Sequence, residues 1–250
     1  FAGQIEAIGK DVTQFAIGQQ IFGCTQFRFG AYAEYMTLPQ NYTMVTKPQN
    51  MSFVEAAAVP LGGINALHFL QRANIQAGET VLINGAGASI GAHAVQIAKS
   101  MGAEVTAVDS AIKKDFLQSI GADHFIDYAV EDCLNNGRRY DVIFNMVPHS
   151  AYSAAIRALK PNGRYLIGNP RLSVMLRSSL MNRFSNKTAI FAFAAETREQ
   201  LNTLRQMIEE EKIRSIVDRI YTMEQAAEAH ERVETEQRNG AVVIAIGESN

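Results

Sequence analysis

The chain has 250 residues, of which 47% are hydrophobic and 19% are charged, and its formal net charge at pH 7 is −2. This length allows one or two globular domains. The near-neutral charge argues against a nucleic-acid partner, and no apolar run reaches the roughly 18 residues that a membrane-spanning helix needs, so we expect no membrane partner. Cys24 and Cys133 lie far apart in unrelated contexts and make no disulfide framework, which favours a cytoplasmic location.

The first 56 residues consist of short, strand-like pieces separated by glycines. The apolar pattern predicts strands near residues 4–8, 20–22 and 31–38. Short strands with frequent turns are typical of a barrel-like or irregular β domain. A helix is predicted over residues 52–58, and Pro60 is expected to break it before helical spacing resumes over residues 64–73.

The most informative segment is a strand, a tight turn and a helix over residues 80–101. The apolar run at 80–84 predicts a buried parallel strand, and residues 92–101 have apolar side chains at helical spacing. Between them, Gly85, Gly87 and Gly91 are spaced one residue more widely than the usual dinucleotide-binding motif. Small side chains let backbone amides approach an anion, and the helix start adds unpaired N–H groups. This turn is therefore predicted to hold a pyrophosphate, although such a turn also occurs simply for close helix–strand packing.

A second strand, at 104–108, ends in Asp109, which lies 18 positions after Gly91. A carboxylate at this distance is suited to accept hydrogen bonds from an adenosine ribose. Further strands are predicted at 124–126, 141–144 and 164–167, with helices at 113–120 and 151–159 between them. This alternation predicts an α/β fold, a Rossmann doubly wound parallel sheet with right-handed crossovers.

The same turn leaves a second reaction class open. Residues 87–91 also spell G-x-S-x-G, the nucleophile elbow of serine hydrolases, with Ser89 as the nucleophile. Asp109 or Asp141 and His149 or His230 follow in the required order. Against this reading, residues 1–78 offer no comparable βα unit to supply an oxyanion hole. A Walker loop is excluded because no Lys-Ser/Thr pair follows Gly91.

Beyond residue 197, the pattern predicts an amphipathic helix at 198–212, a strand at 213–220, a helix at 223–235 and a strand at 241–246. These pieces could extend the parallel sheet or fold back on the first domain. Periodicity does not distinguish the two arrangements.

Several ordered segments together resemble one known family. They are FAGQIEAIG at residues 1–9, GAYAEY at 30–35, AAAVPLGG at 56–63, AVQIAK at 94–99, GAD at 121–123 and LKPNGR at 159–164. On these segments the chain resembles the zinc-independent quinone oxidoreductase branch of the medium-chain dehydrogenase/reductase superfamily, the group that includes zeta-crystallin and enone reductases.

The resemblance implies a GroES-like, mostly β catalytic domain at residues 1–58, a Rossmann domain at 59–212, and a return of residues 213–250 to the catalytic domain. It also implies that the sequence lacks the amino-terminal part of that catalytic domain. The nicotinamide would lie in the cleft between the domains. A homodimer would form through an apolar strand at 188–194.

The resemblance also assigns a cofactor site, and one contact to nicotinamide or substrate at Asn65, which is alternatively a helix N-cap after Gly62 and Gly63. Ala88 replaces a glycine of the usual phosphate loop, which crowds the pyrophosphate by one methyl group. No metal is expected, because neither cysteine lies near a histidine and no cysteine occurs at residues 61–63. The expected cofactor-binding residues are Gly85, Gly87, Ala88, Ser89, Ile90, Gly91, Asp109, Ser110, Lys113, Lys114, Tyr128, Asn145 and Phe191.

The choice between the two nicotinamide cofactors is contested within the sequence. Asp109 favours a free ribose hydroxyl and therefore NAD(H). Lys113 and Tyr128 match positions that hold the 2′-phosphate of NADP(H) in quinone reductases, whereas Lys114 matches a lysine of NAD-using dehydrogenases. NAD(H) is weakly favoured over NADP(H).

The expected activity is a metal-free hydride transfer from the cofactor to a quinone, an α,β-unsaturated carbonyl or a similar small acceptor. Two alternatives remain at this point: a non-enzymatic NAD(P)H-binding member of the same fold, and the serine hydrolase that uses Ser89.

Overall fold

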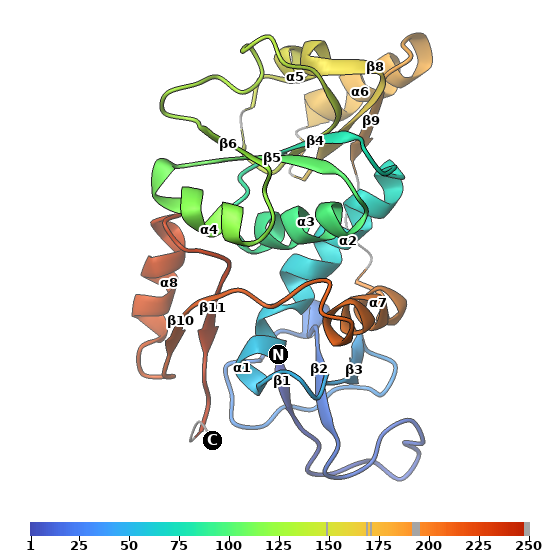
Figure 1. Cartoon of the computed structure of the whole chain (residues 1–250). Helices are drawn as coiled ribbons and strands as arrows, with labels where there is room; N and C mark the ends of the chain where they lie inside the picture. Colours follow the sequence, from blue (N-terminus) through green and yellow to red (C-terminus); the bar gives the residue numbers. More distant parts are fainter. Residues whose placement is uncertain (149, 169, 171, 192–195, 248–250) are drawn as a thin grey trace. The chain divides into compact units, whose positions relative to one another are not determined.

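A computed structural model describes residues 1–148, 150–168, 170, 172–191 and 196–247 (Figure 1). The chain divides into two compact units, one formed by Phe1–Asn65 with Ala195–Asn250 and the other by Ala66–Ala194. This division groups residues 59–65 and 196–212 with the amino-terminal part, whereas the family resemblance implied that they belong to the Rossmann domain. The helix α2 (Pro60–Ala73) runs from the first unit into the second.

The second unit contains one six-stranded parallel sheet in the order β6-β5-β4-β7-β8-β9. The order runs outward from β4 to β6 on one side and from β7 to β9 on the other, which creates a topological switch point between the adjacent strands β4 and β7. This confirms the predicted Rossmann-like α/β architecture. The strands are β4 (Thr80–Asn84), β5 (Glu104–Asp109), β6 (His124–Asp127), β7 (Tyr140–Asn145), β8 (Leu159–Ile167) and β9 (Thr188–Phe191).

Helices connect these strands, with the exception of β6 and β7, whose connecting residues 128–139 form no helix. The helix α3 (Ser89–Ser100) is nearly completely buried from Gly91 to Ala98, which explains the dominance of small side chains there. The others are η2 (Ala111–Lys113), α4 (Lys114–Ser119), α5 (Tyr152–Ala158) and α6 (Leu172–Phe184). The helix α6 was not predicted, although Leu172, Leu176, Leu180 and Phe184 recur at helical spacing; these four side chains face solvent, whereas Val174 and Met181 pack against the core.

The first unit has a three-stranded antiparallel sheet, β1-β2-β3, and a separate parallel pair, β10-β11. The carboxyl-terminal strands therefore do not extend the six-stranded sheet. Ser215 Oγ donates to the Glu55 carbonyl at 2.8 Å, which ties this segment to α1. The elements are β1 (Ala2–Gln4), β2 (Gln20–Gly23), η1 (Gln26–Arg28), β3 (Met44–Thr46), α1 (Phe53–Ala58), α7 (Arg198–Glu209), β10 (Val217–Tyr221), α8 (Ala226–Glu234) and β11 (Ala241–Ile244).

Two strand predictions in this unit were wrong. Residues 31–38 form no strand, and Tyr32 and Tyr35 are 54% and 75% exposed, so their apolar side chains do not mark a core-facing surface. The strand predicted at residues 4–8 lies instead at Ala2–Gln4, where it pairs with β2. The strand β3 was not predicted at all, because three residues are too few to show a period of two.

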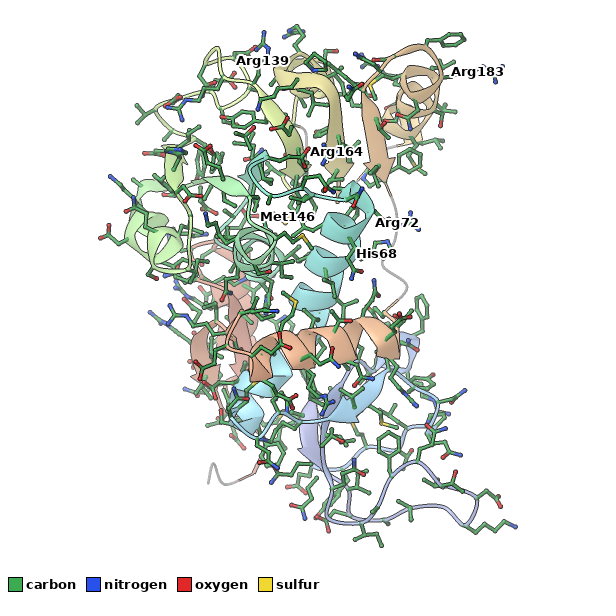
Figure 2. All side chains as sticks on the ribbon, turned by 45° about the vertical axis from the view of Figure 1, so that its right-hand side comes forward. His68, Arg72, Arg139, Met146, Arg164 and Arg183 are labelled. Atoms are coloured by element: carbon green, nitrogen blue, oxygen red, sulfur yellow. The ribbon has the colours of Figure 1, made fainter. Side chains whose placement is uncertain are left out.

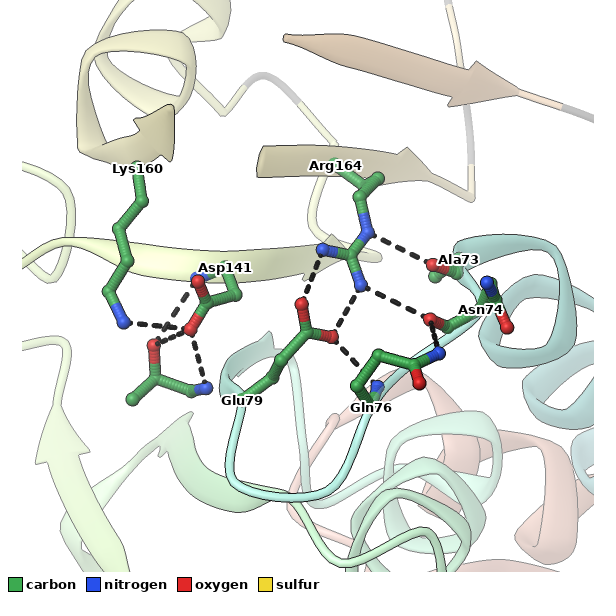
Figure 3. A network of polar contacts seen from close by, with 8 residues as sticks. Ala73, Asn74, Gln76, Glu79, Asp141, Lys160 and Arg164 are labelled. Atoms are coloured by element: carbon green, nitrogen blue, oxygen red, sulfur yellow. Dashed lines mark hydrogen bonds and ion pairs between the residues drawn. The ribbon is translucent and has the colours of Figure 1, made fainter. Parts of the chain in front are cut away.

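A polar network fixes the amino ends of the central strands (Figure 3). Arg164 on β8 makes a two-pronged ion pair with Glu79, with Nη1–Oε1 at 2.8 Å and Nη2–Oε2 at 2.5 Å. Asp141 on β7 accepts hydrogen bonds from the Thr80 N–H and hydroxyl at 2.8 Å, and from Lys160 at 2.7 Å. The network joins β4, β7 and β8 at the edge opposite the glycine turn.

Candidate functional site

The glycine turn begins directly at the end of β4. Gly85 has a φ of +87°, a conformation that other residues adopt only with strain. The amides of Gly85 and Ala86 both donate to the Val108 carbonyl at 3.1 Å, which ties the turn to β5. A Cβ atom on Gly91 would lie 2.3 Å from the Gly85 carbonyl oxygen, so only glycine lets α3 approach the turn this closely. The glycine motif is one residue longer than usual, but α3 still packs closely against the turn that follows β4.

The start of α3 is open to an anion. Ala88 occupies the N-cap position in an extended conformation, and it has no side-chain oxygen to accept from the helix. The first turn also contains no acidic residue. The amides of Ser89, Ile90 and Gly91 have no intrahelical acceptor, and the helix dipole adds a partial positive charge there. These features suit a pyrophosphate group.

Asp109 lies beside this turn at the end of the neighbouring strand β5. Its Oδ2 accepts a hydrogen bond from the Gly87 amide at 2.7 Å. Its Oδ1 accepts from the Ser110 amide at 2.9 Å and lies 3.1 Å from Lys113 Nζ. The predicted ribose-binding carboxylate is thus positioned by the turn itself.

The other residues expected near the adenosine differ in exposure. Lys113 is 3% exposed, whereas Lys114, the first residue of α4, is exposed. Tyr128 is 64% exposed and follows Asp127, which lies opposite Asp109 in the sheet. All of them belong to the carboxyl edge of the sheet.

Two asparagines close the switch point. Asn84 and Asn145 end β4 and β7 and lie opposite each other. Asn84 Nδ2 donates to Asn145 Oδ1 at 2.8 Å, and Asn145 Nδ2 donates to the Val147 carbonyl at 3.0 Å. Asn145 was predicted as a site residue, but Asn84 was missed. The signal for it was present, since both asparagines directly follow an apolar strand.

Asn65 and Phe191 are placed differently from the remaining expected residues. Asn65 lies within α2, where its Nδ2 donates to the Leu61 carbonyl at 2.8 Å. The alternative prediction of an N-cap was wrong, because Pro60 opens this helix rather than breaking it and Gly62 and Gly63 are helical. Phe191 ends the edge strand β9 and packs against the core of the second unit.

The arrangement around Ser89 does not match a hydrolytic triad. Asp141 belongs to the opposite edge of the sheet, and Asp109 accepts from Gly87 and Lys113. His230 bonds to the Tyr32 hydroxyl at 3.0 Å in the first unit, and His149 is outside the described residues. The nearby His93 bonds through Nδ1 to the Ser89 carbonyl at 2.7 Å. Burial lowers the pKa of His93, so this ring is neutral. It is buried and bonded to the backbone of its own helix.

In the described part of the chain, neither the two cysteines nor His68 has the features of a reactive or metal-binding centre. Burial raises the pKa of Cys24 to about 12 and that of Cys133 to about 11, which keeps both thiols protonated. His68 lies one turn before Arg72 on α2 (Figure 2), and burial together with the Arg72 charge lowers its pKa. Among the residues that the structure describes, no three His, Cys, Asp or Glu side chains gather as a metal site would require.

No helix among the described residues combines the length and the apolarity needed to cross a membrane.

Comparison with known proteins gives a consistent result. Residues 120–244 match a family described as zinc-binding dehydrogenase. The quinone oxidoreductase of Pseudomonas aeruginosa is 26% identical, over 97% of this chain and 79% of that protein. The 2-methylene-furan-3-one reductase of Solanum lycopersicum is 27% identical, over 97% of this chain and 61% of that protein.

Solved structures agree with this comparison. The quinone oxidoreductase from Coxiella burnetii superposes with a TM-score of 0.88 at 28% identity, covering 98% of this chain and 77% of that one.

Proposed function

Because the chain belongs to the zinc-binding dehydrogenase family, we propose that it passes a hydride from a nicotinamide cofactor to a quinone or an α,β-unsaturated carbonyl. The similarity to quinone oxidoreductases confirms the predicted resemblance to that branch of the medium-chain dehydrogenase/reductase superfamily. The named activities of two relatives, a quinone oxidoreductase and a 2-methylene-furan-3-one reductase, support both acceptor classes.

The observation that carries this proposal is the open start of α3 beside Asp109. The chain offers unpaired amides, a glycine turn and a carboxylate at one switch point, and this donor and acceptor set fits a dinucleotide. In this proposal Gly85, Gly87, Ala88, Ser89, Ile90 and Gly91 hold the pyrophosphate. The adenosine side is held by Asp109, Ser110, Lys113, Lys114 and Tyr128.

When bound, the cofactor supplies the hydride. The residues of this chain bind it, orient it and restrict its motion, which accounts for much of the rate acceleration in such reactions. We assign Asn145 and Phe191 to the cofactor, and Asn65 to contact with the nicotinamide or the acceptor. No side chain is assigned as a general acid, and water protonates the reduced product.

The proposal includes reaction without zinc, although the family description names that metal. The absence of cysteine at residues 61–63 supports this. NAD(H) is weakly favoured over NADP(H) on the strength of Asp109. A cytoplasmic location, with residues 1–58 and 213–250 as parts of the catalytic domain, belongs to the same proposal.

We also propose a homodimer that forms through the strand predicted at 188–194. Of these residues, Thr188–Phe191 form β9, whose only hydrogen-bonded neighbour among the described strands is β8. The neighbouring helix α6 exposes an apolar stripe at every fourth residue. An isologous interface at this edge would cover both features. The stripe comprises Leu172, Leu176, Leu180 and Phe184, which are 74%, 63%, 62% and 80% exposed. Residues 192–194 are outside the described part.

One experiment tests the activity. NADH and NADPH are titrated by fluorescence, and quinone and enone panels are then added while cofactor oxidation is followed. Binding followed by oxidation supports the proposal, whereas binding without oxidation by any acceptor indicates a non-enzymatic member of the fold. If neither cofactor binds and Ser89 reacts with a fluorophosphonate probe, with Ser89→Ala as the control, the chain is a hydrolase instead.

A further inference from the structure

The ribose-binding carboxylate of this chain carries its own counter-ion. Lys113 Nζ lies 3.1 Å from Asp109 Oδ1, and the two side chains are only 4% and 10% exposed. The stem of Lys113 also lies across Gly87, since a Cβ atom on Gly87 would be 2.3 Å from Lys113 Cδ and 3.0 Å from Nζ. The ion pair therefore covers the middle glycine of the turn.

Each member of this pair would select a different dinucleotide if it stood alone. A free carboxylate at Asp109 accepts from the 2′-hydroxyl of NAD(H) and repels the 2′-phosphate of NADP(H). A free ammonium at Lys113 attracts that phosphate. As a buried pair the two charges compensate, so together they present no net charge to a bound ribose.

We propose that Lys113 is a specificity-determining residue that masks Asp109, so that the site discriminates only weakly between NAD(H) and NADP(H). This inference rests on the proposed function, and it assigns to the pair a property that neither residue has alone. Removing Lys113 unmasks the carboxylate and makes the site selective for NAD(H). Removing the charge of Asp109 releases the ammonium and makes it selective for NADP(H).

The geometry permits either partner to act once the pair separates. Lysine has a flexible four-carbon stem, so its ammonium can leave Asp109 by side-chain rotation. Asp109 remains oriented after that movement, because the Gly87 and Ser110 amides still hold its two oxygens. Tyr128, whose side chain is 64% exposed, follows the strand position opposite Asp109, and its amide donates to the Asp109 carbonyl at 3.4 Å.

The test measures dissociation constants of NADH and NADPH by fluorescence, at fixed ionic strength, for the whole chain and its variants. For the unaltered chain we expect the two constants to lie within about tenfold of each other. Lys113→Met is expected to shift their ratio toward NADH by about tenfold, and Asp109→Asn toward NADPH by a similar factor, the worth of one charge-assisted hydrogen bond. The double variant is expected to return the ratio to near its starting value while weakening both.

Controls separate this inference from general effects. Lys99→Met removes one charge from a half-exposed pair with Asp123 and is expected to leave the ratio unchanged. Competition by 5′-AMP and 2′,5′-ADP reads the same preference without nicotinamide, and Lys113→Gln replaces Lys113→Met if the latter does not fold.

Strong discrimination by the unaltered chain that Lys113→Met does not change would overturn the inference and leave the proposed function intact. Absence of binding by either dinucleotide to the folded, unaltered chain would overturn both.

Discussion

In the six-stranded sheet, the amino ends of the strands (the amino edge) and their carboxyl ends (the carboxyl edge) both carry buried or half-buried charges. The two ends use these charges differently. At the amino edge, Arg164 and Lys160 neutralise Glu79 and Asp141, and the carboxylates also accept backbone hydrogen bonds. At the carboxyl edge, the start of α3 has no side-chain cap and no acidic residue in its first turn. One edge satisfies its polar groups internally, whereas the other leaves donors available.

The pKa values of the two carboxylates at the amino edge reflect this internal pairing. The hydrogen bond from Arg164 is the main cause of the lowered pKa of Glu79. Burial opposes ionisation of Asp141, but hydrogen bonds from Lys160 and Thr80 together outweigh it and leave its pKa below the usual value. We conclude that the amino edge serves stability and that the carboxyl edge is arranged for a ligand. Four substitutions test this division.

Gly91→Ala is expected to have the largest effect. Its Cβ atom would meet the backbone of Gly85 and Ala86 at 2.3–2.6 Å, where neither can yield without moving the turn. We expect a loss of about 3 kcal/mol in the free energy of unfolding, measured with urea. Gly168→Ala is the matched control, because its nearest contact would be 3.6 Å away. Equal stability of the two variants would contradict the close packing described above.

Arg164→Met tests the amino edge. It leaves Glu79 without its two-pronged partner at a site where both side chains are about one-fifth exposed or less. We expect a loss of about 2 kcal/mol in the free energy of unfolding and no change in dinucleotide affinity. Lys99→Met, at a more exposed pair, should cost less than about 1 kcal/mol. A large change in cofactor binding by Arg164→Met would mean that the two edges are not functionally separate.

Gly87→Ala should behave in the opposite way to Arg164→Met, with a small loss of stability and a clear loss of dinucleotide affinity. Its Cβ atom would meet mainly the flexible end of Lys113, and also Asp109 Oδ2 at 2.9 Å, so the structure can adjust. We expect a loss of stability of about 1 kcal/mol, together with a decrease in dinucleotide affinity of about tenfold, since the methyl group narrows the approach to the turn. Calorimetric titration and urea unfolding on the same samples measure both. Unchanged affinity would indicate that the turn does not contact the ligand.

Acid sensitivity gives the smallest expected effect. Because the pKa of Glu79 is lower in the folded chain than in the unfolded one, its contribution to stability is present above the unfolded value of 4.5 and is lost as pH falls through the folded value. Glu79→Gln, which cannot titrate, should show a shallower decline of unfolding free energy below that pH. An unchanged slope would mean that Glu79 does not contribute to the acid response.

Much of the second unit could be predicted from local pattern. The strands β4, β5, β6 and β7 were located to within a few residues, because each is an apolar run bounded by turn residues. The helix α6 was missed, although its leucines recur at every fourth residue, and only the structure shows that they face solvent. In the first unit, residues 31–38 were misread as a strand, because sequence alone does not reveal whether an apolar segment finds a neighbouring strand to pair with.

The candidate site shows the same division. Gly85, Gly87, Gly91 and Asp109 were identified from spacing alone, because their roles depend on backbone freedom and on the order of strand and turn. Asn84 and Asn145 each end an apolar strand in the sequence, but their contact depends on β7 lying beside β4, which brings residues 61 positions apart together. Local periodicity does not encode this neighbour.

By itself, the sequence determined the alternation of strands and helices and the glycine turn, because these follow from hydrophobic period and backbone conformation over a few neighbouring residues. Only the tertiary structure decided that Lys113 lies across Gly87 and that Arg164 reaches Glu79. Those contacts depend on strand order and on side-chain rotamers, which the packing of distant segments sets.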